Sequence, residues 1–345
     1  MPVAGRPGGG RRQVTARWLA RRWFLLLLIG GLTVAVLRPG WVRPLHDALP
    51  LRPVVALSLF LMAWSLEGRR LTAAAGRPAS VGLALAVSFA LVPALALLVA
   101  PLLPLADLRL GLVLMACVPC TLSSAVLWTR HAGGDEAVAL LVVLTTNALG
   151  WLVTPLWLTG AGPVPVTFDP LAMMRSLAVV LVLPVAVGQL VRRVPAVARA
   201  VTRYRAANGV TARLLVAWVL IAAAVDAAEQ LDRVSAGLTG ATLLACVAVH
   251  LGGVTAGLIG GRLAGLARGD RIAVAFAGSQ KTLPVGLLVF GSYYRADYPL
   301  AVLPLLAYHA GQLLVDTLIA DALAAGPPPA DGGPPCTSRF TSIPS

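Results

Sequence analysis

Long apolar segments alternate with short basic loops along most of the chain. Several of these segments reach the roughly 20 residues that a helix needs to cross the hydrocarbon core of a bilayer. The pattern predicts ten membrane-spanning helices, at residues 23–37, 53–66, 81–103, 108–127, 137–158, 177–190, 214–228, 238–258, 272–294 and 300–322. The expected fold class is therefore an all-α membrane protein with ten transmembrane helices.

The composition excludes an ordinary water-soluble domain. Of the 345 residues, 58% are hydrophobic and only 12% are charged, against roughly 25% charged in a typical soluble protein. The mean hydropathy is +0.83. A net charge of +14 would suggest nucleic-acid binding in a soluble protein. Here the arginines lie in short loops, where they orient the chain in the membrane, and no nucleic-acid site is expected.

The distribution of arginine predicts that both chain ends lie in the cytoplasm. With the N-terminus placed inside, the inner segments hold most of the arginines, as the positive-inside rule requires of a protein in the plasma or inner membrane. Residues 1–22 are expected to form a basic cytoplasmic head and residues 23–325 the ten-helix domain. Residues 326–345 are rich in proline and glycine and are expected to be a disordered cytoplasmic tail.

The fourth apolar segment contains a polar interruption at mid-membrane depth, Cys-Val-Pro-Cys-Thr-Leu-Ser-Ser at 117–124. Pro119 removes a backbone donor and is expected to break the helix, while the hydroxyls of Thr121, Ser123 and Ser124 can satisfy the groups that the break releases. Such a break survives in a membrane only where it is buried in protein or lines a wet cavity.

The ninth segment contains a second interruption, at 278–284. Gly278 and Pro284 are expected to mark a helix break that carries the polar residues Gln280, Lys281 and Thr282. Lys281 is the only lysine in the chain. A charge at the bilayer centre costs about 2.5 to 3.5 kcal/mol on insertion scales, so a lysine there indicates a functional site. The alternative is that the helix ends closer to Lys281 than predicted, so that the lysine side chain reaches the membrane surface.

The two interruptions occupy matching positions. Each lies in the fourth of five helices, in halves that run over about 23–158 and 177–322, and five crossings per half invert the second half. This arrangement is typical of inverted-repeat secondary transporters, in which broken helices cross near the midplane and form the binding site. Two independent proline kinks in a packed bundle are the alternative.

Other ionisable residues carry weaker signals. His250 and His309 lie in the eighth and tenth segments and could relay protons, although packed, hydrogen-bonded histidines explain them equally well. Asp316 lies near the middle of the tenth segment and could pair with Lys281.

Motifs for catalysis and for metal binding are absent from the sequence. The spacing of Cys117 and Cys120 fits a CxxC pattern, but both lie in an apolar run, where packing explains them better than a disulfide or zinc. There is no phosphate-binding GxxxxGK[ST] loop, HExxH motif or Gly-x-Ser-Gly stretch. The chain is therefore not expected to be an enzyme, and an ion gradient would supply the energy for any transport.

The motifs resemble those of the bile acid:sodium symporter superfamily, specifically its SBF-like branch of sodium-dependent transporters. The resemblance rests on four stretches and extends over nearly all ten segments: 117–124, 129–136, 147–155 and 278–282. It implies a panel domain and a core domain, broken and crossing fourth and ninth helices, and sodium-coupled uptake of an organic anion by alternating access.

The resemblance also implies particular ligands. Ser124 stands where the family has a serine that binds sodium, and Gln280 matches the glutamine of the second break. Ala125 stands where an asparagine ligand is expected, and Asn147 could complete the polar floor from the following helix.

The acidic residue that the family places just before this glutamine is missing here. Phe276, Ala277 and Gly278 occupy the region, and Lys281 adds a positive charge close by. The ammonium group could take the place of a bound cation, which would make transport uncoupled, proton-coupled or dependent on one sodium ion. It could also contact the anion directly.

The sequence thus predicts a secondary transporter that moves a small organic anion, with sodium or a proton as the coupling ion and no organic cofactor. A regulatory or scaffold protein that keeps the transporter fold without transporting is the alternative. The candidate ion and substrate residues are Thr121, Ser123, Ser124, Asn147, Gln280, Lys281 and Thr282.

Overall fold

The chain is all-α. A computed structural model describes residues 26–65, 76–165, 168–231 and 233–325, and these contain no strand. Seven of its helices are long and apolar enough to cross a membrane, and counting the bent pair Leu26–Leu37 and Pro39–Ala48 gives up to eight. The predicted all-α, multi-pass membrane fold is confirmed at this level. The predicted basic head and proline-rich tail lie outside the described residues.

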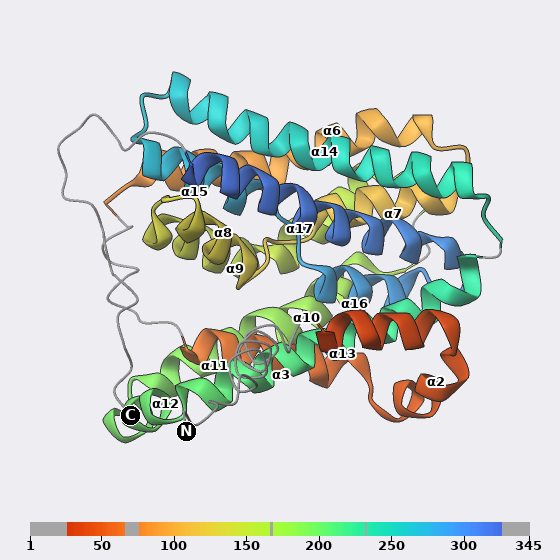
Figure 1. Ribbon diagram of the computed structural model, residues 1–345, viewed down its shortest axis with the longest axis horizontal. Helices are drawn as coiled ribbons and strands as arrows, with labels where there is room; N and C mark the ends of the chain where they lie inside the picture. Colours follow the sequence, from red (N-terminus) through yellow and green to blue (C-terminus); the bar gives the residue numbers. More distant parts are fainter. Residues whose placement is uncertain (1–25, 66–75, 166–167, 232, 326–345) are drawn as a thin grey trace, which may run out of the picture.

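Most elements coincide with predicted segments to within a few residues. After Leu26–Leu37, the elements in chain order are α2 (Pro39–Ala48), α3 (Leu51–Ser65), α5 (Pro78–Ala86), η1 (Val87–Leu91), α6 (Val92–Val99), η2 (Ala100–Leu102), α7 (Ala106–Cys117), α8 (Ser124–His131), α9 (Glu136–Ala161), α10 (Pro170–Leu177), η3 (Ala178–Val182), α11 (Leu183–Arg192), α12 (Pro195–Arg203), α13 (Arg205–Leu231), α14 (Ala236–Leu263), α15 (Arg268–Ser279), α16 (Leu283–Tyr293), η4 (Pro299–Ala301) and α17 (Val302–Ala324). The apolar segments of the sequence did not predict α2 and α12, which are short helices at opposite ends of the bundle (Figure 1).

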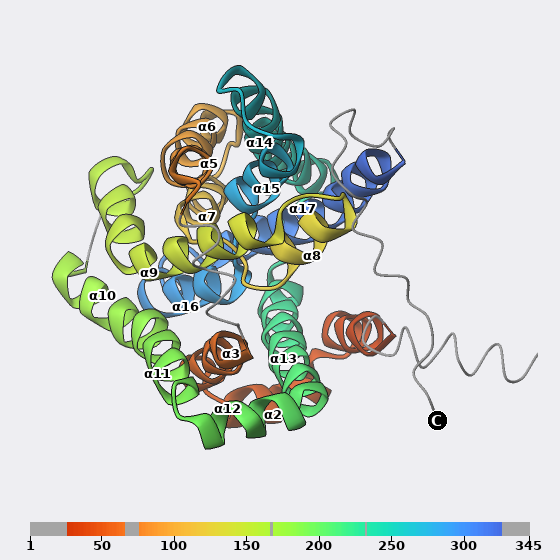
Figure 2. The same cartoon turned by 90° about the vertical axis from the view of Figure 1, so that its left-hand side faces the viewer.

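The helices form two groups, which Figure 2 shows on opposite sides of the molecule. The core group consists of α5 to α9 and α14 to α17, in which α14 packs against both α15 and α17. The panel group consists of Leu26–Leu37, α2, α3 and α10 to α13, in which α3 packs against α11 and α13. The groups meet where α9 contacts α10 and where α13 contacts α16 and α17.

The two helices that the sequence marks as broken lie at the centre of the core group. In the span Arg268–Tyr293, 94% of the most apolar window is buried in protein, against 28% to 50% in the other candidate spans. Nine of the 12 residues of α7 are buried as well, whereas only Ala125 and Thr129 are buried in α8. Protein therefore surrounds α7, α15 and α16, and shields their polar residues from lipid.

Small residues let α14 approach α15 closely. A Cβ atom added at Gly257 would lie 2.6 Å from the Cα atom of Ala275. Close approach over glycine is a common way for membrane helices to gain packing contacts, because lipid supplies no hydrophobic drive for their association.

We expect Gly257→Ala to lower the free energy of unfolding by about 1 to 3 kcal/mol, since the new methyl group meets backbone that must move. Gly240→Ala on the same helix is the matched control, because nothing lies within 4 Å of its added Cβ. Thermal unfolding in detergent measures both. Equal unfolding midpoints for the two variants would contradict this packing.

A charged cluster fixes the ends of three core helices. Arg77, which precedes α5, donates to Asp135 at 2.6 Å and to Asp270 at 2.5 Å. Asp135 also caps α9 by accepting from the backbone N–H groups of residues 137 and 138. Partial burial by itself lowers the pKa of Arg77, but the two carboxylates outweigh it and raise that pKa above its usual value. The cluster ties α5, α9 and α15 together at one end of the bundle.

Candidate functional site

The two helix breaks meet each other. The first runs over residues 118–123 between α7 and α8, and the second over 280–282 between α15 and α16. The backbone N–H of Thr282 donates to the carbonyl of Pro119 at 2.9 Å, which joins the breaks directly. Each break opens with an extended residue, Val118 and Gln280 respectively. Four helix ends therefore meet here, and the ends of broken helices can offer partial charges to ions.

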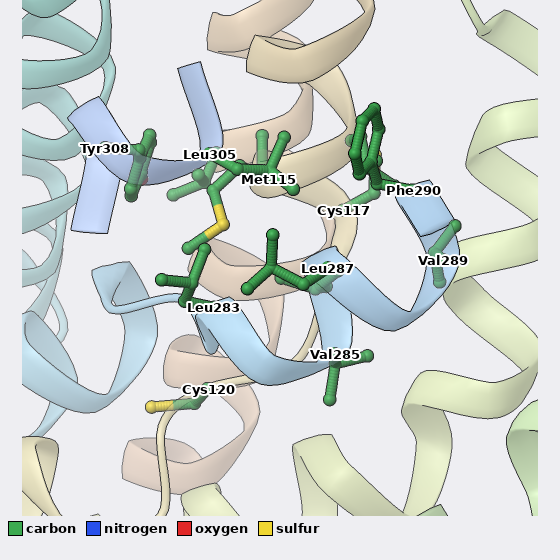
Figure 3. Packing of buried hydrophobic residues seen from close by; sticks show 14 of the residues in the cluster. Met115, Cys117, Cys120, Leu283, Val285, Leu287, Val289, Phe290, Leu305 and Tyr308 are labelled. Carbon is green, nitrogen blue, oxygen red and sulfur yellow. The ribbon is translucent and has the colours of Figure 1, made fainter. Parts of the chain in front are cut away.

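The apolar face of α16 holds this junction in place. Figure 3 shows Leu283 and Leu287 of α16 beside Met115 of α7, which also lies next to Leu305 of α17. A Cβ atom added at Gly286 would lie 3.3 Å from Leu305 and 3.4 Å from the Met115 sulfur. The junction thus has a tightly packed wall, which limits the movement of its polar residues.

Lys281 is fully buried, with 0% of its surface exposed. Its Nζ donates to the Ser88 carbonyl at 2.6 Å, the Ser88 hydroxyl at 3.0 Å and the Val118 carbonyl at 3.2 Å. The ring of Phe89 lies beneath it, 5.9 Å from Nζ to the centroid. Three oxygens thus take the three donors of the ammonium group, as oxygens surround a bound cation.

A π-helical turn makes the Ser88 carbonyl available. In η1 the N–H of Val92 donates to Val87, so it does not serve the Ser88 carbonyl. The next residue, Pro93, has no N–H. π-turns inside helices occur frequently at functional sites. Here the turn leaves the Ser88 carbonyl free to accept a hydrogen bond from Lys281.

A row of side-chain oxygens lies across the two breaks. Ser124 Oγ, at the start of α8, donates to Gln280 Oε1 at 2.7 Å and lies 3.0 Å from Thr121 Oγ1. The structure therefore brings the predicted hydroxyls of the first break together with the predicted amide of the second. Three neutral oxygens within hydrogen-bond distance form a donor set suited to a hard cation such as sodium.

The row continues into a buried carboxylate. Gln280 Nε2 donates to Asp316 Oδ2 at 2.6 Å, and Asp316 Oδ1 lies 2.8 Å from His250 Nε2. Both Asp316 and His250 are fully buried. In the described part of the chain, Asp316 contacts His250 and Gln280, whereas Lys281 bonds to Ser88 and Val118. The pairing of Asp316 with Lys281 was therefore the wrong alternative.

Gln312 clamps the backbone of the second break. Its Oε1 accepts from the N–H of Lys281 and its Nε2 donates to the carbonyl of Lys281, both at 2.9 Å. His309 lies 2.9 Å from the same Nε2. An amide side chain thus replaces the helical hydrogen bonds that the break leaves open.

Asn147 serves the first break from α9. Its Nδ2 donates to the carbonyl of Cys120 at 2.9 Å and to that of Val143 at 2.8 Å. Its Oδ1 is buried without a hydrogen-bond partner. A buried acceptor with no donor is rare, so this oxygen is available to a further ligand.

Three predicted residues play other parts. Ser123 is exposed and its side chain caps no backbone group of α8. The structure thus does not join it to the oxygen row. Gly278 is helical, and α15 ends at Ser279, so the break begins two residues later than predicted. A Cβ atom at Gly278 would lie 3.1 Å from Val87, so this glycine serves packing. Pro284 lies in the first turn of α16, where its missing N–H costs nothing.

No disulfide joins the cysteines in the described part of the chain. Cys117, Cys120 and Cys246 are buried free cysteines. Among the described residues, no group of three or more His, Cys, Asp or Glu side chains could hold a metal ion.

A family model described as the SBF-like CPA transporter family matches residues 22–325. The chain belongs to this family. The resemblance to the bile acid:sodium symporter superfamily is thereby confirmed.

Three relatives of this chain show how far the similarity reaches. A chloroplastic Arabidopsis thaliana protein named as a sodium/metabolite cotransporter is 33% identical over 62% of this chain and 52% of its own length. Sodium/bile acid cotransporter 7 of Danio rerio is 27% identical over 61% of this chain and 63% of its length. An uncharacterized protein of Pseudomonas aeruginosa is 28% identical over 69% of this chain and 71% of its length. The chain thus spans about half to two thirds of the named cotransporters.

Proposed function

We propose that the protein is a secondary active transporter that takes up an organic anion together with one sodium ion. The meeting of the two breaks, with a buried lysine and a row of oxygens between them, is the observation that carries the proposal. The names of the relatives, which refer to sodium/metabolite and sodium/bile acid cotransport, support sodium as the coupling ion.

We infer ten crossings. To the seven long spans we add Leu26–Leu37, α3 and the broken pair α7 and α8. The halves over about 23–158 and 177–322 are then inverted repeats, with breaks in the fourth and ninth helices. Both chain ends lie in the cytoplasm of this arrangement, and the protein resides in the cell membrane.

The oxygen row fits sodium. Ser124 Oγ lies within hydrogen-bond distance of both Thr121 Oγ1 and Gln280 Oε1, and the unpaired Oδ1 belongs to Asn147 of α9, which binds the first break. In broken-helix transporters, open carbonyls and polar side chains of this kind coordinate sodium.

Lys281 acts as a tethered cation. Its nitrogen is held by two carbonyls and a hydroxyl, which are ligands that sodium would use. Because these bonds occupy all three of its protons, the tethered cation is favoured over direct contact with the anion. Lys281 therefore takes the place of one coupling cation, and one sodium ion remains.

Transport follows from movement of the core group against the panel group. The crossing lies wholly in core helices, and α9, α16 and α17 form the contacts with the panel. A rocking motion about these contacts would expose the crossing first to one side of the membrane and then to the other.

Uptake into proteoliposomes tests the proposal. A panel of labelled carboxylate and sulfonate anions is offered under an inward sodium gradient and, in parallel, under choline. Sodium-dependent uptake of at least one anion is expected. A protein that binds sodium but moves none of the panel would favour the scaffold alternative.

A serine enzyme is the remaining alternative, and labelling with a covalent serine probe tests it. We expect no labelling, because Ser124 is hydrogen-bonded to Gln280 and Thr121 rather than to a histidine. Labelling that disappears in Ser124→Ala or in Ser123→Ala would contradict this expectation.

A further inference from the structure

Asp316 is the buried carboxylate of the crossing. It comes from α17 and not from either break, it is fully buried, and its two oxygens bind Gln280 Nε2 and His250 Nε2. A buried carboxylate requires compensation by hydrogen bonds and by positive charge, because removal from water disfavours its ionised form. The amide of Gln280 and the ring of His250 supply the hydrogen bonds. The positive charge has to come from a nearby cation.

The carboxylate determines the orientation of Gln280. Because an ionised carboxylate only accepts hydrogen bonds, the amide must turn its Nε2 toward Asp316. Its Oε1 then points the other way, to Ser124 at 2.7 Å. Asp316, which lies 36 positions further along the chain, therefore orients the oxygen that Gln280 contributes to the row.

We propose that Asp316 supplies the negative charge that balances the coupling sodium, and that it positions the Gln280 oxygen as a sodium ligand. The inference rests on the proposed function. It explains how the chain manages without an acidic residue at Phe276, Ala277 or Gly278. The charge that these positions lack comes from the neighbouring helix α17 and acts through the amide of Gln280.

The charges of the crossing are consistent with this role. Lys281 and Asp316 contribute one positive and one negative charge, and they bind different groups: Lys281 binds Ser88 and Val118, and Asp316 binds Gln280 of the second break. Lys281 and one sodium ion bring two positive charges to the crossing, and the carboxylate of Asp316 offsets one of them. A monovalent anion restores neutrality, so binding of sodium favours binding of the anion.

His250 is a positioning residue for the carboxylate. It fixes the second oxygen of Asp316 and packs edge-on against Tyr308, with the ring centroids 5.9 Å apart. Its Nδ1 is buried without a partner. Only one ring nitrogen is therefore engaged, and the imidazole holds Asp316 without competing for Gln280.

Sodium binding to the purified full-length protein tests the proposal without a substrate. The thermal unfolding midpoint is titrated with sodium chloride against choline chloride at constant ionic strength, which yields an apparent sodium affinity. We expect Asp316→Asn to weaken this affinity at least tenfold. Asp321→Asn is the matched control, because Asp321 lies on the same helix and pairs with His131 at the exposed end of α17. We expect its sodium affinity to be unchanged.

A charge-swapped variant separates charge from folding. In Asp316→Asn combined with Gln280→Glu, the carboxylate moves into the break and the amide moves to α17, with their hydrogen bond preserved in reverse. We expect this variant to recover sodium affinity to within about threefold of the original. It also decides the question if Asp316→Asn alone does not fold.

The proposal would be overturned by an unchanged sodium affinity in Asp316→Asn or by a folded charge-swapped variant that does not bind sodium. Absence of any sodium response in the original protein would also overturn it, since Asp316 would have no ion to serve. Intact sodium binding without anion uptake would contradict the proposed function but leave the role of Asp316 standing.

Discussion

Replacing Lys281 by alanine is expected to abolish sodium-driven anion uptake and to lower the free energy of unfolding by about 3 to 5 kcal/mol. The truncation leaves the carbonyls of Ser88 and Val118 without a donor and opens a cavity at the centre of the core group. It also leaves the crossing with the charge of Asp316 uncompensated. Uptake into proteoliposomes and thermal unfolding in detergent measure the two effects.

Ser88→Ala is the matched control for this prediction. It removes one of the three acceptors of Lys281, the hydroxyl at 3.0 Å, and keeps both carbonyls. We expect a loss of only about 1 kcal/mol, typical of one hydrogen bond, with uptake retained. Normal uptake by folded Lys281→Ala would show that the ammonium group is not part of the transport machinery.

Cross-linking the core group to the panel group is expected to stop transport completely. At the end of the bundle near α2, Arg295 after α16 donates to Asp226 of α13 at 2.7 Å, and Arg52 of α3 donates to Ser292 of α16 at 3.2 Å. These contacts border a cavity of about 510 Å³ between the two groups. A short bis-maleimide between Asp226→Cys and Arg295→Cys should hold the groups together and prevent alternating access.

The background for this experiment carries Cys336→Ser, while the buried cysteines Cys117, Cys120 and Cys246 stay in place. Cross-linking of His131→Cys to Asp321→Cys is the control, because both positions lie within the core group, on α8 and α17. Uptake should survive it. Full uptake after quantitative cross-linking of the first pair would contradict the movement of one group against the other.

The outline of the fold is readable from the sequence because the membrane imposes it. A run of apolar residues near 20 long has few alternatives to a helix in a bilayer, which is why predicted segments such as 137–158 and 238–258 coincide with α9 and α14. The surface helices α2 and α12 carry no such run, so apolar length alone could not find them.

The site was readable only in part. Pro119, Ser124, Gln280 and Lys281 stand out because polar residues and proline are costly at membrane depth. Ser88 does not, since one serine in an apolar helix is unremarkable until the π-turn before Pro93 turns its carbonyl toward Lys281. Pro93, which has no N–H group, is the sequence feature that could have pointed to the Ser88 carbonyl.

The partners supplied by α14 and α17 required the tertiary structure. Gln312 and Asp316 lie four residues apart on one face of α17, yet only packing against the second break reveals that one clamps its backbone and the other binds its amide. No spacing rule within the sequence connects residue 280 with residues 250 and 316.

The number of sodium ions bound at saturation tests most directly whether Lys281 takes the place of one coupling cation. Equilibrium dialysis of the purified protein against radioactive sodium, with choline maintaining the ionic strength, gives this number. The tethered lysine and the single oxygen row predict one sodium ion per chain. Two ions per chain would mean that Lys281 replaces none, and no bound sodium would contradict sodium coupling altogether.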